Sequence, residues 1–68
     1  MNDEAFNMSI RKFLKTVGVN SQLAIEKAVR KAIEDGKLKG DETMPLEMTL
    51  TLGKLGLNVK FDGELKLE

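Results

Sequence analysis

The sequence contains no cysteine, no histidine, no tryptophan and no tyrosine. Without cysteine the chain has no disulfide, no thiolate metal ligand and no thiol nucleophile. Without histidine it lacks the commonest metal ligand and the side chain that titrates nearest neutral pH, and a conventional serine triad cannot be assembled. We therefore predict that the protein is not an enzyme and holds no cofactor or zinc ion.

The chain also has no excess of either charge and no long apolar run. Eleven basic residues balance eleven acidic ones, so there is no overall attraction to nucleic acid or to an anionic membrane. No apolar stretch approaches the roughly 20 residues of a membrane span. The acidic start, Met1 to Glu4, differs from the basic beginning of a secretory signal. These features predict a cytoplasmic protein without membrane contact.

What is present fits one small folded domain over residues 1–68. The chain is 41% hydrophobic and 32% charged, a composition typical of a folded soluble protein. A chain this short buries only about 60% of its unfolded surface, so its stability margin is thin. Small domains often compensate through disulfides, metals or self-association.

Two helices are expected in the first half, over residues 3–17 and 21–35. Asn2 or Asp3 can cap the first helix, and its apolar stripe is Phe6, Ile10, Phe13 and Val17. Gly18 suits a helix end, and Asn20 or Ser21 can cap a second helix that stops at Gly36. The second stripe consists of Ile25, Ala28, Val29, Ala32 and Ile33. Glu26 and Arg30 have the i, i+4 spacing of an ion pair on its exposed face.

From Leu46 the apolar period changes to two, which predicts strands over residues 46–52, 57–61 and 64–67. Pairing Leu52 with Leu57 across Gly53-Lys54-Leu55-Gly56 also pairs Leu50 with Val59 and Met48 with Phe61. All of these apolar side chains then share one face. Met44 and Leu38 fall in the loop before the strands.

The Asp62-Gly63 pair suggests a second turn. A two-residue turn would mix apolar and polar faces, so we predict a three-residue bulged loop with Gly63 left-handed. That loop pairs Val59 with Leu65, Leu57 with Leu67, and Lys60 with Glu64. The predicted fold is α+β, with two N-terminal helices packed on a three-stranded antiparallel meander (ααβββ) in two layers.

The helical half is basic, with a balance of +3 over residues 1–40 against −3 over residues 41–68. Met8 and Leu23 lie off the apolar stripes among basic side chains. A candidate interaction surface follows from these residues: Met8, Arg11, Lys15, Leu23, Lys27, Arg30 and Lys31.

Two functions of different class fit this surface. The first is a non-enzymatic interaction module that forms a homodimer or docks on an unidentified protein partner. The alternative is a nucleic-acid-binding helix-turn-helix over residues 9–35, with Gly18 in the turn. Against it, the domain carries no basic excess and only two helices are visible.

The chain resembles a family of very short, uncharacterised bacterial proteins of chiefly proteobacterial occurrence. The resemblance rests on Met1 to Glu4, Asn7 to Val19, Gly36 to Gly40 and Asp62 to Glu64. It implies a stand-alone bacterial cytoplasmic protein. It brings no catalytic residue, ligand or partner, because the family has none established.

Overall fold

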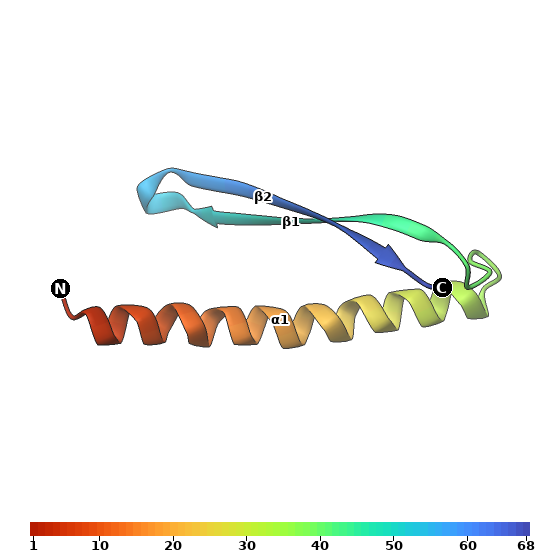
Figure 1. The fold of residues 1–68 in the computed structure, drawn as a ribbon, viewed down its shortest axis with the longest axis horizontal. Coiled ribbons are helices and arrows are strands. Elements are labelled where there is room, and N and C mark those ends of the chain that lie inside the picture. The colour runs from red at the N-terminus through yellow and green to blue at the C-terminus, as the bar shows by residue number, and fades with distance from the viewer. The chain divides into compact units, whose positions relative to one another are not determined.

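The computed structural model describes all residues from Met1 to Glu68. The chain divides into two units, residues 1–37 and 38–68, and each is described by itself. The first unit holds one helix, α1 (Asp3–Glu34). The second holds a β-hairpin made of β1 (Thr43–Leu52) and β2 (Leu57–Lys66), joined by the short 3₁₀ turn η1 (Gly53–Leu55) (Figure 1).

α1 is one continuous helix of 32 residues, so the predicted break after Val17 is wrong. Gly18 does not adopt a left-handed conformation and lies within α1. A glycine inside a helix costs only about 0.5–1 kcal/mol relative to alanine. Apolar side chains also continue on one face past Gly18, with Val17, Ala24 and Ala28 at i, i+7 and i+11.

Both ends of α1 follow the signals in the sequence. The Asn2 side chain accepts a hydrogen bond from the backbone N–H of Ala5 at 3.0 Å, which confirms an N-cap at this position. At the other end Gly36 takes φ +76°. The N–H of Gly36 donates to the Ile33 carbonyl at 3.1 Å, and that of Lys37 donates to the Ala32 carbonyl at 2.8 Å. These two bonds form a Schellman motif, and the predicted stop at Gly36 is confirmed.

The hairpin confirms the predicted register of its first pairing. Leu52 lies opposite Leu57, Leu50 opposite Val59, and Met48 opposite Phe61. The turn is the predicted Gly53-Lys54-Leu55-Gly56 segment, closed by a 3.1 Å hydrogen bond from the Gly56 N–H to the Gly53 carbonyl. Gly56 takes φ +66°, which explains a glycine there.

The predicted second turn and third strand are wrong, because β2 runs without interruption from Leu57 to Lys66. Gly63 is not left-handed and pairs with Leu46. Residues 64–67 therefore extend β2 along β1 rather than folding back on it. β1 also begins earlier than predicted, and Met44 lies in the strand opposite Leu65.

The predicted ααβββ architecture is consequently replaced by one helix followed by a two-stranded antiparallel hairpin. A helix-turn-helix requires two helices with a turn between them. Because α1 passes straight through residues 9–34, the predicted helix-turn-helix motif is not formed. Nucleic-acid binding by the basic helix faces stays a prediction. No residue of the chain is buried, so neither unit forms a core of its own.

Candidate interaction surface

All seven residues of the predicted interaction surface lie on α1. Met8, Arg11 and Lys15 are spaced i, i+3 and i+7, and Leu23, Lys27 and Arg30 are spaced i, i+4 and i+7, so each set shares a helix face. Met8 is 62% exposed and Leu23 is 58% exposed. We call the full set the basic strip: Met8, Arg11, Lys15, Leu23, Lys27, Arg30 and Lys31.

The cations of the basic strip are mostly unpaired. Lys31 forms an i, i+4 ion pair with Asp35, with Nζ and Oδ2 3.4 Å apart. The other four have no carboxylate within ion-pair distance. The predicted Glu26–Arg30 pair is not formed; Glu26 instead accepts a hydrogen bond from Gln22 at 3.0 Å. The strip therefore presents uncompensated positive charge to a partner.

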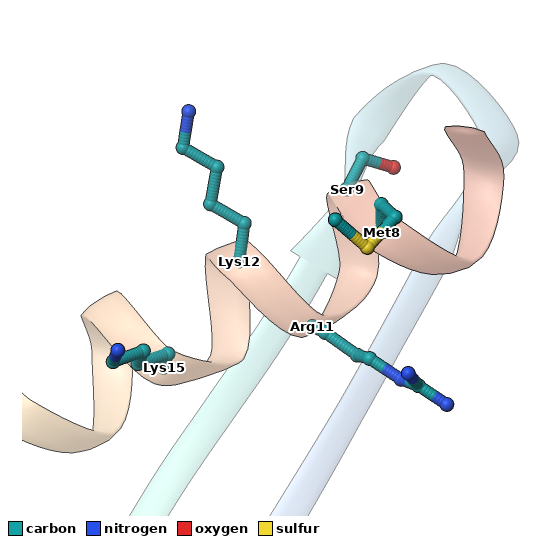
Figure 2. A pocket seen from close by; sticks show the side chains of 5 residues that line it. All are labelled: Met8, Ser9, Arg11, Lys12 and Lys15. Atoms are coloured by element: carbon teal, nitrogen blue, oxygen red, sulfur yellow. The ribbon is translucent and has the colours of Figure 1, made fainter. Parts of the chain in front are cut away.

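Positive charge is most concentrated in the N-terminal half of α1. Residues 5–25 contain no carboxylate, and their three charged side chains are Arg11, Lys12 and Lys15. With Met8 and Ser9 they line an open hollow on the helix surface. Figure 2 shows that the side chains of Arg11 and Lys12 extend away from the helix in different directions.

This divergence limits what the hollow can bind. A small anion is held by donors that converge on it, and here the charged ends point apart. Ser9 adds no free donor, because its hydroxyl donates to the Phe6 carbonyl at 2.8 Å. The basic strip is suited to contact along a broad surface rather than to enclosing a small ligand.

Each unit also exposes large apolar side chains. On α1 they occur in both halves of the helix, with Phe6 at 50%, Phe13 at 54% and Ile33 at 44% exposure. On the hairpin the even residues of β1 and the odd residues of β2 point to one side. The hairpin apolar face comprises Met44, Leu46, Met48, Leu50, Leu52, Leu57, Val59, Phe61 and Leu65.

The opposite face of the hairpin is polar and charged. Glu47 lies directly opposite Asp62, an unfavourable pairing of like charges. Lys60 relieves it, since its Nζ lies 3.8 Å from Glu47 Oε1. The hairpin is thus fully amphipathic, and one of its two faces is unsuited to water.

The loop between α1 and β1 is organised by one carboxylate. Glu42 accepts backbone hydrogen bonds from Lys39 and Gly40 at 2.9 Å and from Asp41 at 3.2 Å. The hydrogen bond from Lys39, followed by that from Gly40, lowers the pKa of Glu42, since donated N–H groups stabilise the charged form. Glu42 is therefore engaged within its own loop. No group of three or more acidic side chains converges to hold a metal ion.

Sequence reasoning located the basic strip but missed the full extent of the hairpin apolar face. The prediction places Met44 in a loop, although its position continues the alternation of apolar residues along β1. Leu65 was assigned to a separate strand, although its odd number continues that of β2. An unbroken period of two was the available signal, and the Asp62-Gly63 pair obscured it.

The chain is thus a helix followed by an amphipathic antiparallel hairpin. The chain matches a family of unknown function, DUF6494, over residues 1–68, and it belongs to that family. This confirms the resemblance to an uncharacterised family. No curated protein and no solved structure shows a match to the chain. Although α1 is long, no helix of the protein is apolar enough to cross a membrane.

Proposed function

We propose that this protein is a non-enzymatic interaction module that works by self-association. The two apolar faces are the surfaces that copies of the chain cover, and the basic strip is a further contact surface. The family resemblance adds a bacterial, cytoplasmic setting to the proposal. Enzymatic chemistry is not proposed, because the sequence offers neither histidine nor cysteine as a base or nucleophile.

The observation that carries the proposal is that two amphipathic units expose their apolar faces and no residue is buried. A helix gains most of its stability in proteins from packing an apolar face. A lone two-stranded hairpin is marginal in water, and three or more strands or a covering helix are needed for independent stability. Neither unit can therefore complete a core from its own residues.

The ways in which small chains are usually stabilised point to self-association. Chains below about 70–80 residues rely on disulfides, a structural metal, cyclisation, oligomerisation or exceptionally well-packed helices. Disulfides are excluded by the sequence, and a zinc site built from cysteine or histidine is excluded with them. Self-association is the support that matches the exposed apolar faces.

The distribution of charge along the chain also favours association between copies. The balance of +3 over residues 1–40 and −3 over residues 41–68 allows the basic half of one copy to face the acidic half of another. A chain with no net charge gains nothing overall from a polyanion such as nucleic acid. Complementary halves instead favour association between copies, with a dependence on salt.

The basic strip is tested by Leu23→Glu, which places a carboxylate on an apolar side chain that is 58% exposed. We expect weaker association, measured as mass by size-exclusion chromatography with light scattering, and an unchanged circular dichroism spectrum. Leu23→Gln is the matched control, since it removes the same apolar side chain without adding a charge. Unchanged association of Leu23→Glu would remove the strip from the interface, and a monomeric wild type would contradict the whole proposal.

A further inference from the structure

We propose that two copies pair through the outer edges of β2, giving a four-stranded antiparallel sheet in the order β1-β2-β2-β1. This inference rests on the self-association proposed above and names the surface that carries it. The partner is a second copy of this chain, related by a two-fold axis that passes through the sheet at Asp62.

The outer edge of β2 is open and continuous. β2 pairs only with β1, so every second residue directs its N–H and C=O away from the hairpin. The Leu67 N–H donates to the Glu42 carbonyl at 3.0 Å, which places the odd residues of this strand toward β1. The outward backbone groups therefore belong to Asn58, Lys60, Asp62, Glu64 and Lys66.

The outer edge of β1 is interrupted, which sets the two edges apart. By the same alternation, Pro45 occupies an outward position on β1, opposite Glu64. Proline has no N–H to donate, and it is a common device for blocking a sheet edge. β2 contains no proline along its ten residues. A second strand can consequently add to β2 along its whole length but not to β1.

The side chains of β2 fit a second copy in one register. With Asp62 opposite Asp62 of the second copy, Val59 meets Leu65, Leu57 meets Leu67 and Phe61 meets Gly63. The first two are the apolar pairs that the sequence favours between residues 57–61 and 64–67. Continuous β2 prevents them within one chain, and a two-fold axis provides each of them twice.

The charged face of β2 fits the same register. Lys60 of each copy lies opposite Glu64 of the other, an opposite-charge cross-strand pair that occurs twice. The two Asp62 side chains meet at the axis, and each has a Lys60 of the other copy on its diagonal. Charged side chains usually discourage edge pairing. Here Lys60 and Glu64 complement their counterparts on a second copy of the same strand.

The pairing also extends the apolar surface. A two-fold axis perpendicular to the sheet keeps the apolar faces of both hairpins on one side. The resulting four-stranded sheet passes the three-strand threshold for independent stability that the hairpin does not reach. It presents one broad apolar face.

The absence of native cysteine makes a direct test available. Asp62→Cys places two thiols opposite each other at the axis, where the roughly 5.5 Å between paired Cα atoms permits a disulfide. We expect a covalent dimer on mild oxidation. The matched control is Thr49→Cys, an outward position on β1, which should remain uncrosslinked. Lys60→Cys mixed with Glu64→Cys should crosslink, whereas either alone should not.

The unmodified protein provides a second readout that needs no substitution. Amide hydrogen exchange should show protection at Lys60, Asp62 and Glu64, and rapid exchange at the outward amides of Glu47 and Thr49. A dimer by light scattering with exposed β2 amides and no Asp62→Cys crosslink would overturn this inference and leave the proposed function standing. A monomer at every concentration would overturn both.

Discussion

Glu42 shows how one side chain organises a segment that has no regular structure. Its carboxylate gathers three consecutive backbone N–H groups, from Lys39, Gly40 and Asp41. Gly40 takes φ +105°, a conformation open to glycine, and this allows the loop to close around the carboxylate. The loop between α1 and β1 is therefore held by a local electrostatic contact rather than by apolar packing.

We expect Glu42→Gln to loosen this loop, because an amide oxygen accepts these hydrogen bonds more weakly than a carboxylate does. Amide exchange at Lys39 to Asp41 should accelerate. Asp41→Asn is the control, since the Asp41 carboxylate accepts none of these bonds. Equal exchange in both variants would show that the Glu42 charge does not hold the loop.

The lowered pKa of Glu42 gives this contact a defined pH dependence. A carboxyl group whose pKa is lower in the folded chain stabilises the fold above its unfolded pKa, and that stabilisation is lost as pH falls through the folded value. The stability difference between wild type and Glu42→Gln should therefore be full near neutral pH and shrink under acid conditions. Thermal unfolding of both proteins across a pH series measures it.

At the scale of elements, α1 shows where local signals and periodicity disagree. Gly18 followed by Asn20 and Ser21 reads locally as one helix ending and another beginning. Phe6, Val17 and Ala28 nevertheless recur every 11 residues, close to three helical turns, so these three apolar side chains share a face across Gly18. Cap signals contribute only about 1 kcal/mol, and α1 runs through them as one helix of 32 residues.

Because Gly18 lies inside α1 and Gly36 ends it, we expect opposite effects when each glycine is replaced by alanine. Gly18→Ala should stabilise the protein by about 0.5–1 kcal/mol, because it removes backbone entropy inside a helix and its added methyl group meets no atom within 4 Å. Gly36→Ala should destabilise it by roughly 1–2 kcal/mol, because φ +76° is left-handed. Urea unfolding at one fixed protein concentration measures both. A destabilising Gly18→Ala would indicate a helix end at Gly18.

The hairpin shows the same disagreement between local turn signals and periodicity, here with a period of two. The odd residues from Leu57 to Leu67 alternate without a break, with Gly63 as a neutral member of the series. Asp62-Gly63 suggested a turn because this dipeptide is the strongest short hairpin signal. A two-residue turn mixes the apolar and polar faces, and a three-residue turn needs a bulge. A continuous strand needs neither. The register of the first turn was predictable because the pattern and the turn residues agreed there.

At the scale of the whole molecule, the sequence allowed the polarity of every face to be predicted but not how many elements share each face. The basic strip lies on α1 as expected from its spacing, and the paired residues of β1 and β2 follow from alternation. The predicted number of elements is wrong because Gly18 and the Asp62-Gly63 pair indicate breaks that α1 and β2 do not have. An apolar pattern indicates a face that favours burial, and it does not identify the residues that cover that face.

Self-association is the central claim, and the mass of the purified wild-type protein across a dilution series tests it most directly. We expect light scattering to give a dimer or a larger oligomer that dissociates on dilution, and that dissociates more readily at physiological than at low salt, because the basic and acidic halves attract one another. A monomeric mass at every concentration and at both salt levels, with the chain still folded, would contradict the account.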